Sequence, residues 1–202
     1  MSFNVEKYRI IISRIAAAAA LLFLFICDSH WVAENKMFTS FMFVAGIVFA
    51  GAASLGRMWC SLYIAGYKDE KLITKGPYSI CRNPLYFFSM VGVTGIGLCT
   101  GTLTFPALFL LLFSIYYPFV IKREEKRLKS IFGTRFSDYT RKVPAFIPNP
   151  LIFEEPDNYT VNPSVYRVHI FSALWFIWVI GIFEVVRAFK KTGMMPPVLT
   201  LY

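Results

Sequence analysis

The stretch from Lys75 to Phe88, KGPYSICRNPLYFF, places side chains that can bind a polar ligand at the start of an apolar segment. It contains an arginine and an asparagine, which donate hydrogen bonds, and two tyrosines, whose ring faces attract cations. A segment that only anchored a helix in a membrane would need no more than one or two lysines there. The stretch therefore predicts a binding site.

Two adjacent carboxylates, Glu124 and Glu125, follow a second apolar segment. Carboxylates pair with ammonium groups or accept hydrogen bonds from hydroxyls, and an arginine can hold a carboxylate. Together with the tyrosine rings, these groups suit a ligand that has a cation, an anion and an aromatic ring. S-adenosylmethionine has all of these parts, as do other ligands.

The composition indicates which elements position these residues. Of 202 residues, 56% are hydrophobic and only 16% are charged, too few to cover a soluble globule. Apolar segments of about 20 residues predict membrane-spanning helices. We expect an all-α, polytopic membrane helical bundle of about five transmembrane helices with a cytoplasmic interfacial helix. The predicted spans are Ile10–Cys27, Met37–Trp59, Pro84–Cys99, Leu103–Ile121 and Tyr166–Phe189.

The short connection TGT, Thr100 to Thr102, predicts that the third and fourth spans form a tight antiparallel hairpin. This hairpin would bring the two glutamates close to Arg82 and Asn83. The first span lacks a convincing cleavage site, so we expect it to be retained rather than removed as a signal peptide.

The net charge of +9 is concentrated between spans two and three and between spans four and five. The positive-inside rule therefore predicts that both basic segments face the cytoplasm, in a bacterial inner membrane or the endoplasmic reticulum. We attribute the charge to topology and attraction to anionic lipid, and we expect no nucleic acid partner. Arg187, Lys190 and Lys191 would lie on the outer side, which leaves the topology of the C-terminal segment open.

The segment Lys122 to Pro148 is amphipathic, with apolar residues at helical spacing among many charges. We expect it to lie at the membrane interface, with Gly133 ending a helix and Pro144 forcing an extended exit. The apolar positions of this stripe are Leu128, Ile131, Phe132, Phe136, Tyr139 and Val143.

Each candidate residue also has a purely structural explanation. Glu125 can pair with Lys129, and Glu124 with Arg127, as on any helix surface. Tyr78 and Tyr86 fit an interfacial aromatic belt, Arg82 a topology anchor, and Pro84 the first turn of a helix. The four cysteines and two histidines show no ligand spacing, so we expect no metal site.

Two blocks of the sequence resemble the paired signatures of the isoprenylcysteine carboxyl methyltransferase family of integral membrane enzymes. The first is LITKGPYSICRNPLY, similar to L-[VI]-T-x-G-x-Y-x-x-x-R-[HN]-P-x-Y. The second is REEKRLKSIFGTRFSDYTRKVPAFIP, similar to E-E-x-x-L-x-x-x-F-G-x-x-Y-x-x-Y-x-x-x-V-P, with Phe136 in place of the first tyrosine. The resemblance covers about Tyr63 to Pro148.

The resemblance implies that the cofactor is S-adenosylmethionine, held between the hairpin and the cytoplasmic loops. It implies a cofactor-binding role for a set of residues in the two blocks. Arg82 would orient the cofactor, and Glu125 would either support the contacting residues from behind or lie on the surface. The implied cofactor residues are Lys71, Leu72, Ile73, Tyr78, Arg82, Asn83, Pro84, Leu85, Tyr86 and Glu124.

The chain departs from the family pattern at two positions. Asn83 replaces a histidine and cannot titrate, so no catalytic base is assigned there. Val120 stands where the eukaryotic enzymes have an arginine for the carboxylate of prenylcysteine. We therefore expect poor activity on prenylcysteine.

The leading hypothesis is a membrane-embedded S-adenosylmethionine-dependent methyltransferase that acts on a lipophilic or small-molecule acceptor. Carboxyl O-methylation and amine N-methylation both fit the sequence. We expect a helix pair in residues 1–62, a methyltransferase core in 63–148, and a linker with a last transmembrane helix in 149–202. One alternative is a membrane reductase with a related core, which would bind a nicotinamide cofactor. Another is a non-catalytic scaffold or small transporter. No charged residue in the middle of a span suggests a transport pathway, because Arg14 and Arg57 lie near span ends and Glu184 can pair with Arg187.

Overall fold

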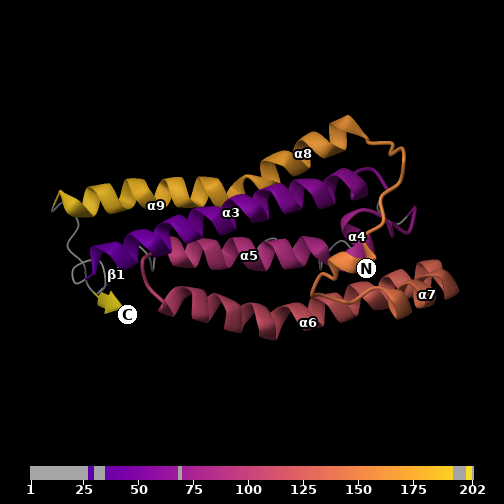
Figure 1. The fold of residues 1–202 in the computed structure, drawn as a ribbon, viewed down its shortest axis with the longest axis horizontal. Coiled ribbons are helices and arrows are strands. Elements are labelled where there is room, and N and C mark those ends of the chain that lie inside the picture. The colour runs from indigo at the N-terminus through magenta and orange to yellow at the C-terminus, as the bar shows by residue number, and fades with distance from the viewer. Residues whose placement is uncertain (1–26, 30–34, 68–69, 193–198, 202) are drawn as a thin grey trace, which may run out of the picture.

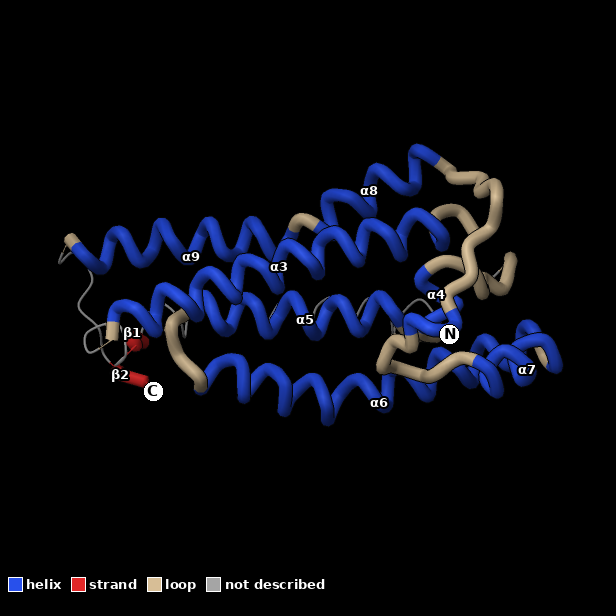
Figure 2. Tube along the Cα trace, viewed as in Figure 1, coloured by secondary structure: helices blue, strands red, loops and turns tan. Residues whose placement is uncertain are grey.

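The computed structural model describes residues 27–29, 35–67, 70–192 and 199–201, and the fold is given for these ranges. Helices dominate them (Figures 1 and 2). The helices are α3 (Lys36–Ile64), α4 (Pro77–Ile80), α5 (Pro84–Cys99), α6 (Thr104–Phe132), α7 (Thr134–Lys142), the 3-10 helix η1 (Pro150–Ile152), α8 (Pro163–Ala173) and α9 (Trp175–Lys191). Two three-residue strands, β1 (Cys27–Ser29) and β2 (Leu199–Leu201), pair in parallel.

The prediction of an all-α membrane bundle is confirmed. Three segments are long and apolar enough to cross a bilayer: α3, α6, and α8 with α9 taken together, and α5 is a shorter apolar helix. Large apolar side chains on their outer faces are exposed, as expected in contact with lipid. The chain is an integral membrane protein. The first predicted span lies outside the described residues, except for Cys27, which begins β1.

Helices α3 and α5 pack along a seam of small residues. A Cβ atom on Gly46 would lie 2.6 Å from the carbonyl oxygen of Gly95, so the two backbones touch. Helix α9 covers this seam, and the buried cluster that results joins all three helices. It consists of Ala50, Ala53, Ile96, Cys99, Phe176, Val179 and Ile180.

The predicted hairpin of α5 and α6 is confirmed (Figure 1). Gly101 adopts a φ of 74°, and the hydroxyls of Thr100 and Thr102 lie 2.9 Å apart in a buried turn. Arg187 of α9 stabilises this end, because its Nη2 donates to the carbonyl oxygen of Cys99 at 2.6 Å. The predicted pair of Glu184 with Arg187 is also present, at 2.9 Å.

The opposite end of the bundle gathers the residues of both signatures, and we call it the motif end. There α3 ends, α5 begins, and α6 continues past its apolar part to meet α7 (Figure 2). Gly133 separates α6 from α7 with a φ of 55°, as the sequence predicted. In the amphipathic stripe, Phe136, Tyr139 and Val143 are buried, Leu128 and Phe132 pack against them partly buried, and Ile131 is exposed.

Residues 149–162, which we call the strap, cross the motif end between α7 and α8 (Figure 1). The backbone N–H of Gly76 donates to Glu154 O at 2.8 Å, and the N–H of Asn149 donates to Ile80 O at 2.9 Å. The Tyr63 hydroxyl donates to the Glu155 carboxylate at 2.9 Å. The strap therefore fixes the position of the first signature.

Candidate functional site

The first signature turns sharply at Gly76 before α4. Gly76 has a φ of 60°, and a Cβ atom there would collide with the ring of Tyr63. Only glycine fits this position without strain. Lys75, next to it, forms an ion pair with Glu154 of the strap.

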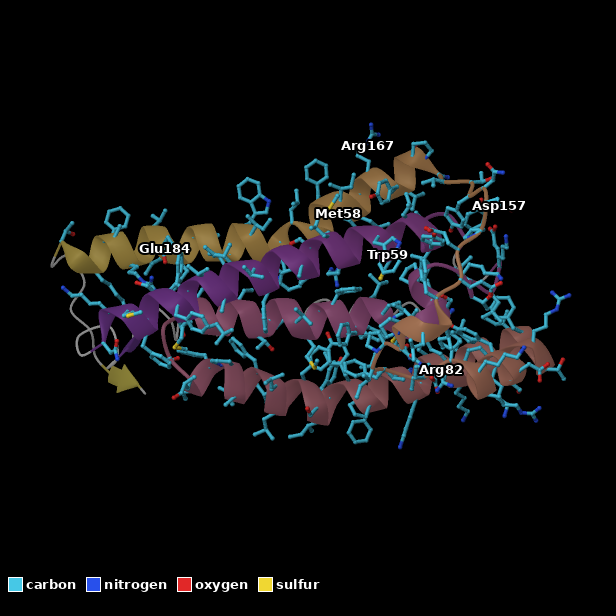
Figure 3. The ribbon with its side chains drawn as sticks, in the orientation of Figure 1. Met58, Trp59, Arg82, Asp157, Arg167 and Glu184 are labelled. Carbon is cyan, nitrogen blue, oxygen red and sulfur yellow. The ribbon has the colours of Figure 1, made fainter. Side chains whose placement is uncertain are left out.

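Arg82 joins the first signature to the second (Figure 3). Its backbone N–H donates to Pro144 O at 2.9 Å, and its Nη1 donates to Thr140 O at 2.8 Å. Its Nη2 lies 2.9 Å from Glu125 Oε1, and both side chains are largely buried. The two signatures, distant in sequence, are thus in direct contact.

The partners of the two glutamates differ in part from the sequence-based expectation. Glu124 pairs with Arg127 at 2.6 Å, as helical spacing predicted. The expectation that Glu125 pairs with Lys129 on the surface was wrong, because Arg82 holds this carboxylate in a less exposed position. Helical spacing considers only neighbours on α6, and the contact with Arg82 comes from the folding of the hairpin.

Asn83 and Pro84 start α5. The Asn83 side-chain amide donates to Ala145 O at 2.9 Å, and Pro84 occupies the first helical turn, fully buried. Tyr86 follows on α5, and its ring packs edge-on against Tyr117 of α6 at 5.1 Å. The sequence does not reveal the backbone carbonyls that accept hydrogen bonds from Arg82 and Asn83, because every residue type has a carbonyl.

The remaining predicted cofactor residues fall into two hydrophobic clusters. Leu72 packs with the cluster that includes Phe136. Ile73 and Leu85 pack with the cluster around Tyr78. Lys71 is exposed, with its ammonium 5.9 Å from the ring centroid of Tyr67. The structure thus gathers the predicted residues at the motif end without bringing all of them into mutual contact.

Two cavities open at the motif end, and Arg82 lines both. One, of about 590 Å³, lies along the segment 140–150. The other, of about 510 Å³, lies between α6 and α7 and contains Glu125 and three lysines that the signatures did not single out. These lysines are Lys122, Lys126 and Lys129. Tyr78, Asn83, Tyr86 and Glu124 line neither of these two cavities.

Three buried polar atoms of the signatures lack a hydrogen-bond partner: Tyr78 Oη, Arg82 Nε and Glu125 Oε1. Glu125 Oε1 lies 2.9 Å from Arg82 Nη2 and forms an ion pair with it, but the angles are not those of a hydrogen bond. Burial raises the pKa of Tyr78 well above its usual value, so the phenol is neutral. Burial likewise raises the pKa of Tyr139, whose hydroxyl donates to Tyr78 O at 2.6 Å.

A buried donor without a hydrogen-bond partner, Arg82 Nε, beside the carboxylate of Glu125 suits a ligand that carries both an anion and a cation. The Arg82 Nε–H can donate to a carboxylate, and the Glu125 carboxylate can accept from an ammonium. The amino-acid end of S-adenosylmethionine has these two groups. The residues present therefore fit this cofactor.

Comparisons with known proteins identify the family. The family model described as phospholipid methyltransferase matches residues 37–135, a range that contains Arg82, Glu124 and the other implied cofactor residues. The chain belongs to the isoprenylcysteine carboxyl methyltransferase-like family of membrane proteins. A protein-S-isoprenylcysteine O-methyltransferase of Schizosaccharomyces pombe is 33% identical over 40% of this chain and 34% of its own length.

Two relatives match nearly the whole chain. The cobalt-zinc-cadmium resistance protein CzcN of Cupriavidus metallidurans is 33% identical over 96% of this chain and 89% of its own length. The nickel-cobalt-cadmium resistance protein NccN of Alcaligenes xylosoxydans is 32% identical over 96% of this chain and 90% of its own length. No solved structure matches.

Metal ligands are not grouped in the part of the chain that the structure describes. Among these described residues, histidine, cysteine, aspartate and glutamate side chains do not form a group of three or more that could hold a metal ion. The buried thiols of Cys60, Cys81 and Cys99 are free cysteines.

Proposed function

We propose that this membrane protein is an S-adenosylmethionine-dependent methyltransferase that acts on a lipophilic or small-molecule acceptor. The observation that carries the proposal is the Arg82–Glu125 contact, which joins the two family signatures at one end of the bundle. Arg82 Nε, which has no hydrogen-bond partner, and the Glu125 carboxylate beside it supply the donor and acceptor for the cofactor's amino-acid end. We propose that Lys71, Leu72, Ile73, Tyr78, Asn83, Pro84, Leu85, Tyr86 and Glu124 complete the cofactor site.

The chemistry required of the protein is mainly orientation. When bound, S-adenosylmethionine supplies an electrophilic methyl group on its sulfonium. The residues of this chain hold donor and acceptor in line and exclude water, which is worth roughly 7–11 kcal/mol in favourable cases. The aromatic faces of Tyr86 and Tyr117 are suited to stabilise positive charge.

Glu124 is proposed to contact the polar part of the cofactor. In the structure it pairs with Arg127, and its side chain is 33% exposed, so its carboxylate is accessible to a ligand. Val120 offers no cation for the carboxylate of prenylcysteine, so the acceptor is proposed to be a different molecule.

The test is methyl transfer by the purified protein reconstituted in bacterial lipid extract with methyl-tritiated S-adenosylmethionine. We expect tritium to enter the organic-soluble fraction, and Glu124→Gln to reduce this incorporation at least tenfold. Asp138→Asn is the matched control, because Asp138 pairs with Arg141 on the exposed face of α7 at 3.5 Å. Absence of incorporation by the wild type in lipid and small-molecule fractions alike would contradict the proposal.

A nicotinamide-dependent membrane reductase is the second candidate. The observation in its favour is the cavity that combines Arg82 with three lysines, since phosphate groups attract such a set. Calorimetry with reduced nicotinamide dinucleotide phosphate separates the candidates. Binding of this dinucleotide, together with no binding of S-adenosylhomocysteine, would favour the reductase.

A further inference from the structure

Arg57 lies on α3, the helix Lys36–Ile64, which is long and apolar enough to cross a membrane. The sequence placed it near the end of a span at Trp59, and α3 continues to Ile64, seven residues beyond Arg57. A charge packed among the helices of a membrane bundle is costly unless a partner compensates it, so such residues are typically functional.

The partners of Arg57 are neutral. Its Nη1 donates to Ser89 Oγ of α5 at 2.6 Å, and its Nη2 donates to Ser172 Oγ of α8 at 3.2 Å. Its guanidinium carbon lies 5.8 Å from the ring centroid of Phe176. Its Nε is buried and has no hydrogen-bond partner.

The charge of Arg57 is not balanced by a carboxylate within ion-pair distance among the described residues. Two other partly buried arginines differ in this respect, since Arg82 lies 2.9 Å from Glu125 and Arg187 lies 2.9 Å from Glu184. Arg57 is therefore a cation in an apolar environment, and an anionic ligand would balance its charge.

The surroundings of Arg57 connect the lipid face with the motif end. Ser172 is exposed on the outer face of α8, as are the apolar side chains of Phe171 and Val168 near it. On the inner side, Arg57 reaches Ser89 of α5, six residues after Asn83 of the first signature.

We propose that Arg57 binds the anionic head group, a carboxylate or a phosphate, of a lipid-like acceptor that enters from the bilayer between α3 and α8. This inference rests on the proposed methyltransferase function and narrows its acceptor to an anionic amphiphile. Ser89 and Ser172 position the guanidinium, and the exposed apolar side chains of α8 accommodate the chain of the ligand. Arg57 thus supplies inside the bundle the cation that position 120 lacks.

The experiment measures binding of three radiolabelled probes to the protein in phosphatidylcholine nanodiscs. Palmitate tests a carboxylate, hexadecyl phosphate tests a phosphate, and hexadecanol is the neutral control. Two neutral variants, Arg57→Gln and Arg57→Met, are made so that the result does not depend on the folding of one. Arg57→Lys keeps the charge, and Arg167→Gln removes an exposed arginine from α8 as the matched control.

We expect the wild type to bind at least one anionic probe about tenfold or more tightly than hexadecanol. The neutral variants should lose this preference, Arg57→Lys should keep part of it, and Arg167→Gln should keep all of it. Whichever of palmitate and hexadecyl phosphate binds identifies the head group. Equal binding of all three probes by the wild type, or an unchanged preference in the neutral variants, would overturn the proposal.

Calorimetry with S-adenosylhomocysteine on the same proteins tests the methyltransferase proposal separately from the anion site at Arg57. Arg57→Gln or Arg57→Met should bind it as the wild type does, because Arg57 serves the acceptor. If these variants lost cofactor affinity as well, Arg57 would belong to the cofactor site, and the acceptor proposal would be wrong. If the wild type bound the anionic probe but no S-adenosylhomocysteine, the methyltransferase proposal would fail and the anion site would stand.

Discussion

Arg82 and Glu125 form the contact on which the architecture of the motif end depends. Their side chains are 13% and 24% exposed, so solvent screens the ion pair only in part. Glu125→Gln leaves the guanidinium without its counter-charge, and we expect it to lower the free energy of unfolding by about 1–3 kcal/mol. Chemical denaturation in detergent micelles measures this loss, and Asp138→Asn should change stability by less than about 0.5 kcal/mol.

A double-mutant cycle with Arg82→Gln tests whether the two side chains act on each other. If the two single losses simply add, then the pair makes no net interaction and the contact is only a consequence of the fold.

Cys81 links pH to the stability of the first signature. Its thiol donates to Phe146 O at 3.0 Å, and burial raises the pKa of Cys81 from 9.0 to about 11. The folded state therefore favours the neutral thiol. The stabilisation of the folded state by the neutral Cys81 thiol is fully present below pH 9 and is lost as the pH rises toward about 11.

Thermal unfolding of the wild type and Cys81→Ala between pH 8 and pH 11 measures this contribution. The stability advantage of the wild type should shrink over the upper part of this range. A constant difference between the two proteins across the range would show that Cys81 does not titrate differently in the folded state.

The sequence indicated most of the candidate site residues at the motif end, because their chemistry is visible in the residue type alone. It placed Arg82 and Asn83 near the glutamates, and the structure agrees for Arg82 and Glu125. It missed the carbonyl partners at Thr140 and Ala145, since a backbone acceptor has no residue type. It also missed the last turn of α3, because the end of this helix is set by packing and not by hydropathy.

Among the helices, hydropathy predicted the three long apolar segments that the structure describes and the shorter apolar helix α5. The glycine after Phe132 predicted the end of α6. The boundaries differ where tertiary contacts override the local pattern. Helix α3 continues beyond Trp59 because Cys60 and Tyr63 pack in the cluster around Tyr78. The strap was expected only as a linker, and its contacts with the first signature depend on pairs far apart in sequence.

Gly133 separates α6 from α7 in a backbone conformation that other residues rarely adopt, with φ 55° and ψ −122°. No atom lies within 4 Å of the place where a Cβ would stand, so the cost of Gly133→Ala is conformational. We expect a loss of about 1–2 kcal/mol in stability and faster amide hydrogen exchange in α7.

Gly181→Ala in α9 is the matched control, because its Cβ would also meet open space but its backbone is helical. This control should be neutral or slightly stabilising. If both substitutions changed the free energy of unfolding by the same amount, the backbone conformation of Gly133 would not explain the loss.

At the scale of the whole molecule, the two signatures lie at one end of a membrane bundle, so they must face the same side. The positive-inside rule predicts that this side is the cytoplasm. Single cysteines at Lys75 and at Thr134, in a protein without its native cysteines, should be labelled by an impermeant maleimide only in inverted vesicles. Labelling of either position in right-side-out vesicles would contradict this topology.

In the proposed function, Glu124 contacts the polar part of the methyl-donor cofactor at the motif end. Calorimetry with S-adenosylhomocysteine on the wild type, Glu124→Gln and Asp138→Asn measures this contact. Charge-assisted hydrogen bonds contribute about 1.5–3 kcal/mol, so Glu124→Gln should bind roughly 10- to 150-fold more weakly. Asp138→Asn should match the wild type, whereas equal affinity in Glu124→Gln, or no binding by the wild type, would contradict the account.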